Sequence, residues 1–344
     1  MEASEPVLNI LERPWARILL SLVLVVVIGS SLAAPISWGA KALATSLEGS
    51  ALLNNAWLAD LHESLGSSPF TRYYDRAILL AAILVLVPLR RWLGGPGGEL
   101  DCRVGPAPIG GWFSAGHHWL AGFLIAGAAL LTLGMLYLGI SAFHPRPPSG
   151  SSPAWFGHLV SALTVGVLEE ALFRGLILAI VLRSMRTVPA IFFVSLLFAI
   201  LHFVHPPEED LPRTVEWLDG WRMSGVSLQR MLQPNDFLAE LCTLFAVGWV
   251  LASLRLRSGS IWLPAGVHAG WVFCLKQFSS MARDSAAVDR GEMLPWIGGN
   301  LRTGLAPLLF ILITWAVVCW WLRLSGEGRK ADLAVTKSST AGKS

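Results

Sequence analysis

The fold of this chain is decided by residues 159–182, which read LVSALTVGVLEEALFRGLILAIVL. The stretch is apolar and longer than the roughly 20 residues that an α-helix needs to cross a bilayer, yet Glu169, Glu170 and Arg174 lie near its middle. Each such charge costs about 2.5–3.5 kcal/mol at the centre of a membrane helix, so charges there face a protein interior or a water cavity and usually mark function. The stretch therefore predicts a membrane-spanning helix that carries a functional site.

The composition of the whole chain is typical of a membrane protein. Of its 344 residues 54% are hydrophobic and 14% are charged, and the mean hydropathy is +0.58; an average soluble domain has about 25% charged residues. The net charge is only +3 and the basic residues form no stripe, which excludes a nucleic-acid partner. The four cysteines lie far apart without a CxxC spacing, which argues against a zinc or redox motif.

Eight apolar runs predict an all-α, polytopic membrane helix bundle of about eight transmembrane helices. Three runs lie in an N-terminal membrane region (1–150), four lie in residues 154–281, and the last (303–323) precedes a tail (324–344) that we expect to be disordered and cytoplasmic. The predicted spans are 16–36, 76–93, 118–143, 154–182, 188–205, 237–254, 260–278 and 303–322.

The Lys and Arg residues next to the spans predict the orientation in the membrane. With the N-terminus inside, the inner side carries the larger number, and Arg183, Arg186, Arg255 and Arg257 lie in very short inner turns. Both termini are therefore expected in the cytoplasm. The preference for Arg over Lys favours a bacterial inner membrane. A cleavable secretory signal is the alternative for the first run, although three glutamates before it spoil the basic region that such a signal needs.

The three charges of the fourth span divide into two roles. Glu170 and Arg174 are four residues apart, one helical turn, with the acid before the base, which is the better order for an ion pair. Glu169 points about 100° away from Glu170 and is left to face a cavity. The alternative for the pair is a buried ion pair that only holds helices together.

Histidines occur in two other predicted spans. Phe198, His202 and His205 recur at i, i+4 and i+7 on one face of the fifth span, and His268 lies in the seventh. A lone histidine in an apolar helix is more often a packing residue, but Glu and His together are what the activation of water requires. His205 is also explained as a residue at the water boundary. His158 is a poor candidate because it lies about 16 Å from the acidic pair along the helix.

These residues resemble the CPBP (CaaX protease and bacteriocin-processing) family of intramembrane proteases, which includes the type II CaaX prenyl endopeptidases and bacterial immunity homologues. The family pattern is Glu-Glu-x-x-x-Arg, then Phe-x-x-x-His, then His-x-x-x-Asn on successive core helices. Here the first motif is EEALFR (169–174), the second is FAILH (198–202) and the third begins at His268. The resemblance covers about residues 154–278 and implies that residues 154–281 form a four-helix catalytic core.

The resemblance implies an intramembrane endopeptidase that requires no cofactor. Glu169 would act as general base on a water with the help of His202, Glu170 and Arg174 would position the helix, and His268 would donate to the oxyanion of the tetrahedral intermediate. A poorly solvated carboxylate is a suitable base near neutral pH. The alternative is a metal-dependent enzyme in which Glu169, His202 and His268 hold Zn²⁺.

One position departs from the family pattern. Val272 stands where the family often has Asn, and an oxyanion donor is worth about 2.7–4 kcal/mol. The indole N–H of Trp271 is a candidate replacement. Without one, the chain would be slow, or would be a non-catalytic membrane immunity or scaffold protein. The third functional alternative is an ion-coupled transporter. Such proteins are commonly built from internal repeats, which the two halves of this sequence do not show.

The expected partners are the lipid bilayer and a membrane-associated protein or peptide substrate. In a bacterium the substrate would be a peptide precursor or a membrane-anchored protein rather than a prenylated one. The segment 206–236 contains Trp217, Trp221, Arg222 and Arg230. It is interpreted as a solvated loop with an interfacial helix, or alternatively as a cap over the cavity.

Overall fold

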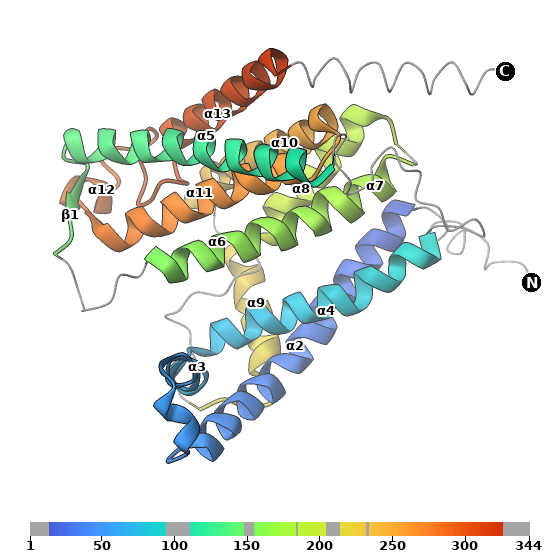
Figure 1. Cartoon of the computed structure of the whole chain (residues 1–344), viewed down its shortest axis with the longest axis vertical. Helices are drawn as coiled ribbons and strands as arrows, with labels where there is room; N and C mark the ends of the chain where they lie inside the picture. The colour runs from blue at the N-terminus through green and yellow to red at the C-terminus, as the bar shows by residue number, and fades with distance from the viewer. Residues whose placement is uncertain are drawn as a thin grey trace, which may run out of the picture. The chain divides into compact units, whose positions relative to one another are not determined.

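The computed structural model describes residues 14–93, 111–147, 155–183, 185–203, 214–231 and 234–325. These residues are mostly helical, as predicted, with one short pair of antiparallel strands (Figure 1). By packing, the chain divides into two compact units. The first consists of residues 1–98 and 201–234, and the second of residues 99–200 and 235–344.

The first unit is a helical hairpin with a short helix packed against it. Its elements are α2 (Pro14–Leu47), the 3₁₀ turn η1 (Ala51–Asn54), α3 (Ala56–Ser67), α4 (Phe70–Leu93) and α9 (Asp219–Met231). α2 packs along α4 and against α9 (Figure 1). A Cβ atom at Gly220 would collide with the backbone carbonyl of Ser30, so the absence of a side chain allows α9 to contact α2 directly.

The second unit is built around α11. Its elements are α5 (Gly111–Gly139), β1 (Phe143–Pro145), α6 (Trp155–Glu170), the π-helix η3 (Ala171–Ile177), α7 (Leu178–Val181), α8 (Thr187–Leu201), α10 (Pro234–Ser258), α11 (Trp262–Met281), β2 (Ala282–Asp284), α12 (Ala286–Asp289) and α13 (Leu305–Leu324). α11 packs against both α5 and α6, and α13 packs against α5 (Figure 1). Sequence reasoning placed α5 in the N-terminal region, whereas the packing groups it with α11.

Small residues allow α11 to approach its two neighbours closely. A Cβ atom at Gly266 would collide with the carbonyl of Trp119 on α5, and one at Gly270 would lie 2.5 Å from the carbonyl oxygen of Phe123. On the α6 side, a Cβ atom at Gly166 would lie 2.9 Å from a backbone oxygen of α11. Small residues allow helices of a membrane bundle to approach closely in this way.

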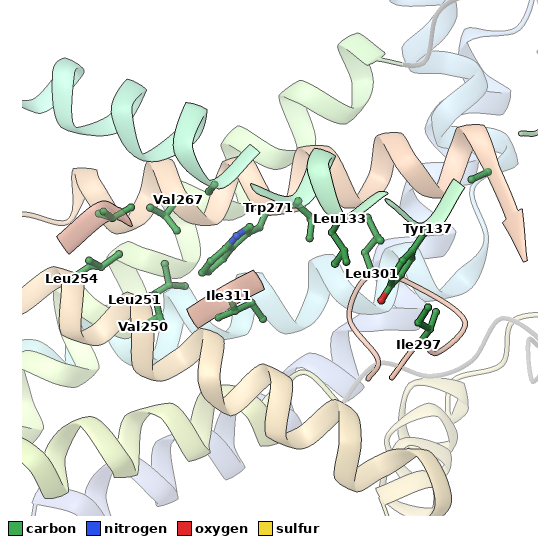
Figure 2. Close-up of a cluster of buried hydrophobic side chains, with 14 of the residues drawn as sticks. Leu133, Tyr137, Val250, Leu251, Leu254, Val267, Trp271, Ile297, Leu301 and Ile311 are labelled. Carbon is green, nitrogen blue, oxygen red and sulfur yellow. The ribbon is translucent and has the colours of Figure 1, made fainter. Parts of the chain in front are cut away.

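An apolar cluster forms the core of the second unit (Figure 2). Leu133 and Tyr137 come from α5, Leu251 from α10, and Val267 and Trp271 from α11, and all five are buried. Because side chains of three helices interdigitate here, the cluster fixes the position of α11 relative to α5 and α10.

Four of the described helices are long and apolar enough to cross a membrane. They make this chain a multi-pass membrane protein, as expected from its composition. The four candidate spans are Ala16–Leu47, Ser114–Gly139, Glu240–Ser258 and Leu305–Leu324, and the shorter helix Thr187–Leu201 is also apolar.

The third predicted span ends earlier than the hydropathy indicates. The prediction was 118–143, but α5 ends at Gly139. Ser141 has a φ of 58°, in the left-handed region that an α-helix cannot continue through. Phe143 then pairs with Asp284 in the β1–β2 ladder instead of extending the helix.

Candidate active site

The two glutamates lie at the junction of two kinds of helix. α6 ends at Glu170, and the π-helix η3 begins at the next residue and includes Arg174. π-helical turns are rare and occur frequently at functional sites. This junction could not be predicted from the sequence, because hydropathy does not distinguish a π-turn from an α-turn.

The predicted ion pair within the fourth span is confirmed. Nη1 of Arg174 lies 2.7 Å from Oε1 of Glu170, and both side chains are fully buried. The guanidinium also donates from Nη2 to the carbonyl oxygen of Gly248 at 3.1 Å and lies over the ring of Phe198, 4.5 Å from its centroid. The desolvation of two buried charges costs several kcal/mol per ion, and only good geometry with further hydrogen bonds offsets it. The surroundings of Arg174 supply one further hydrogen bond, but among the described residues Nε of Arg174 and Oε2 of Glu170 are buried without a hydrogen-bond partner.

Glu170 has a second partner that the sequence did not predict. Oε1 of Glu170 lies 3.0 Å from Nδ1 of the buried His268, so a single carboxylate oxygen holds both Arg174 and His268. A carboxylate accepts but does not donate hydrogen bonds, so Nδ1 of His268 carries the proton in this pair. The two residues are 98 positions apart, and no local pattern in the sequence connects them.

Glu169 lies on the other side of the same imidazole. Its Oε2 is 3.9 Å from Nε2 of His268, beyond direct hydrogen-bond range. The side chain of Glu169 is 28% exposed, whereas that of Glu170 is fully buried. As the sequence predicted, adjacent carboxylates occupy different environments, one paired in the interior and the other at a partly open position.

His202 lies at the point where α8 has ended. The fifth span was predicted to continue to His205, but α8 stops at Leu201 and His202 is in the turn that follows, half-buried. Two prolines follow at 206 and 207, and the α conformation is disfavoured directly before proline, which favours an early end. His202 is grouped with the first unit, and His205 lies outside the described residues.

The helix that carries His268 also carries the two residues discussed as oxyanion donors. Val272 follows His268 by one turn of α11 and is half-buried. Trp271 is buried within the apolar cluster of the second unit (Figure 2), which favours a packing role for its indole. Phe198 packs edge-on to the imidazole of His268, with 6.0 Å between the ring centroids.

The residues of the zinc alternative, Glu169, His202 and His268, are divided between the two units. Among the residues that the structure describes, no group of three or more His, Cys, Asp or Glu side chains is placed together to hold a metal ion. Nδ1 of His268 bonds to Glu170 and its Nε2 lies 3.9 Å from Oε2 of Glu169, an arrangement that metal-bound histidines also adopt.

His158 is separate from this site, as predicted. Its Nδ1 lies 2.7 Å from Oε1 of Gln277, near the opposite ends of α6 and α11. Lys276 donates to the hydroxyl of Ser161 at 2.9 Å in the same region. These contacts join the two helices far from the acidic pair.

Comparison with known proteins supports the resemblance seen in the sequence. Residues 151–274 match the family model described as Type II CAAX prenyl endopeptidase Rce1-like. The matched range contains all five predicted catalytic positions, namely Glu169, Glu170, Arg174, His202 and His268. A search of the curated proteins finds no match to the chain.

Proposed function

Residues 151–274 form a domain of the Rce1-like type II CAAX prenyl endopeptidase family, a family of membrane proteases, and from this premise we propose that the chain is an intramembrane endopeptidase. It hydrolyses a peptide bond of a membrane-associated protein or peptide precursor with a water that Glu169 activates. The observation that carries this proposal is the pair formed by Glu169 and His268, with 3.9 Å between Oε2 and Nε2.

The proposed reaction uses Glu169 as base and then as acid. Glu169 takes a proton from water as its oxygen attacks the scissile carbonyl carbon, which becomes tetrahedral with an oxyanion. When the intermediate collapses, the C–N bond breaks and Glu169 returns the proton to the leaving amine. The products are a carboxylic acid and an amine, so atoms and charge balance.

His268 stabilises the oxyanion, and Glu170 is the residue that enables it to do so. Because Nδ1 of His268 donates to Glu170, a neutral ring has no proton on Nε2. Donation from Nε2 therefore requires the doubly protonated ring. Because Glu170 is already paired with Arg174, the carboxylate that balances the charge of this ring is that of Glu169, 3.9 Å from Nε2. Arg174 in turn holds the carboxylate of Glu170, so Glu170 and Arg174 are positioning residues.

The same proposal includes the arrangement in the membrane. Helical segments lie within all eight predicted spans, which supports a count of eight even though only four meet the criteria of length and composition. The density of Arg in short turns supports cytoplasmic termini. We place the chain in a bacterial inner membrane with no required cofactor.

The test is cleavage of a library of membrane peptides by purified protein, with and without a strong chelator. Glu169→Gln is expected to lower the rate by about 100-fold or more, because general base catalysis contributes about that much. Glu63→Gln, the same change at an exposed position of α3, serves as the matched control and is expected to retain full activity. Loss of wild-type activity with the chelator would overturn the metal-independent mechanism.

A second candidate function is a non-catalytic immunity or scaffold protein of the same family, and Val272 is the observation that favours it. In that case wild type would be inert and Glu169→Gln would retain the cellular phenotype. If instead the missing amide only slows the enzyme, Val272→Asn is expected to raise the cleavage rate by up to about 100-fold.

A further inference from the structure

Helix α9 of the first unit presents small and polar residues together with one methionine toward α2. Its buried positions are Asp219, Gly220, Met223 and Ser227. Ser224 on the edge of this face bonds through its hydroxyl to Ser30 of α2 at 2.7 Å. Met223 packs in an apolar cluster with residues of α2 and α4. The inner face of α9 is therefore mixed in polarity.

The outer face of α9 is apolar and exposed. Trp221 and Leu228 are seven residues apart, on one side of the helix, and are 40% and 61% exposed. Trp217 and Leu218, in the turn before the helix, are both 57% exposed. We call these four residues the α9 apolar face. An apolar surface of this kind marks contact with a protein or a membrane.

The neighbouring helices show at which depth α9 lies. Ser224 of α9 bonds to Tyr74 of α4 at 2.7 Å, and Asp75 and Arg76, the next two residues of α4, are exposed charges. On one side of this level the exposed residues of α2 and α4 are apolar. These rows consist of Leu19, Leu20, Val23, Leu24 and Val27 on α2 and Leu79, Leu80, Ile83 and Leu84 on α4. On α4, the level of α9 is therefore where a lipid-facing row gives way to charged residues, whereas the candidate span of α2 continues past this level to Leu47.

We propose that the α9 apolar face inserts into the interfacial region of the lipid bilayer, so that α9 is an interfacial anchor of the first unit. Tryptophan is enriched at this depth because its ring is apolar and its N–H remains hydrated. Trp38 of α2 extends the same surface, since its ring lies 5.9 Å from that of Trp217 and its Nε1 donates to the carbonyl of Val215. The α9 apolar face is thus continuous with the exposed ring of Trp38 on α2.

The charges around α9 indicate which lipid the surface contacts. Arg222 is exposed, but its guanidinium is paired with Asp219 at 2.9 Å and with Glu216 at 3.2 Å. These described side chains therefore present no excess positive charge to an anionic headgroup. The contact is apolar, and we expect it to form equally in zwitterionic phosphatidylcholine.

The test measures the depth of a fluorescent label on the full-length chain. The four cysteines are replaced by alanine, Leu228→Cys or Gln229→Cys is introduced and labelled with bimane, and the protein is reconstituted in phosphatidylcholine vesicles. Gln229 is also exposed but lies about 100° around the helix. Lipids brominated near the headgroup end of the acyl chain are expected to quench the label at 228 about twofold, and that at 229 much less.

Aqueous iodide supplies the opposite readout. It is expected to quench the label at 229 more strongly than that at 228. Equal iodide quenching at the two positions would show a face in water and overturn the proposal. A label at 228 that neither quencher reaches would also overturn it, because protein would then cover the face. Neither readout depends on proteolysis, so this proposal and the proposed function can fail separately.

Discussion

Each unit of the molecule buries a polar cluster among apolar helices, and the two clusters are built differently. In the second unit the charged cluster consists of Glu170, Arg174 and His268. In the first unit the hydroxyl cluster consists of Ser30, Tyr74 and Ser224, where the Ser224 oxygen lies 2.7 Å from each of the other two.

The difference between these clusters indicates what each is for. Three neutral hydroxyls donate and accept among themselves, so their burial costs little once they are paired. Buried charges cost several kcal/mol per ion before pairing, and an apolar replacement of the whole group is often equally stable. Stability alone therefore explains the hydroxyl cluster but not the charged one, which is better explained by chemistry at His268.

The largest expected effect comes from breaking the charged cluster at Arg174. Arg174→Met leaves Glu170 as a buried carboxylate without its cation, which costs about 3–5 kcal/mol of unfolding free energy. Equilibrium unfolding in mixed micelles measures it. Arg257→Met, at an exposed arginine 5.6 Å from the ring of Trp315, is the matched control and should lose about 1 kcal/mol or less. Equal losses would remove the distinction between the two clusters.

The double variant sharpens this result. Glu170→Gln alone should also cost about 3–5 kcal/mol, because it leaves the buried guanidinium of Arg174 without its counter-charge. Adding it to Arg174→Met should restore part of the stability, since no carboxylate is then left buried without its cation. Unfolding of the four proteins of the cycle gives the coupling energy, expected at about 1–3 kcal/mol. Additive losses would mean that the two residues do not act as a pair.

In the hydroxyl cluster a smaller effect is expected. Tyr74→Phe removes one of the oxygens bonded to Ser224 and should cost about 1 kcal/mol in the same unfolding assay. Tyr137→Phe is the matched control, because among the described residues its buried hydroxyl has no hydrogen-bond partner. That variant should be neutral or slightly stabilising. If both tyrosines respond alike, the bond to Ser224 contributes nothing.

The smallest effect is expected at Ser30. Ser30→Ala leaves Ser224 bonded to Tyr74, so the loss should be about 0.5–1 kcal/mol. Thermal unfolding of the reconstituted chain compares it with Ser31→Ala, whose hydroxyl bonds only to its own helix at Val27. A loss from Ser30→Ala as large as that from Arg174→Met would contradict the view that neutral clusters tolerate substitution.

The spacing of residues in the sequence predicted the helices and the contacts within a single helix. Hydropathy located the helices, and the four-residue spacing predicted the ion pair of Glu170 with Arg174. The bond from Glu170 to His268 could not be predicted, because it depends on the rotation of α11 about its axis relative to α6. Glycines determine how closely α11 packs against its neighbours. The position of a glycine in the sequence does not reveal which carbonyl of the neighbouring helix it contacts. The end of α8 at Leu201 was missed because the apolar pattern continues beyond it.

The π-helix that follows Glu170 makes the length of this segment as important as its composition. A π-helix winds more residues into each turn than an α-helix does, so η3 contains a length of chain that a regular helix would not hold. Deletion of a single residue, such as Leu172, would remove the extra residue of the π-turn and place the arginine three instead of four positions after Glu170. The family motif would then be one residue too short to align the arginine with the carboxylate of Glu170. In evolutionary comparison, gaps within residues 171–177 are therefore as informative about activity as substitutions are.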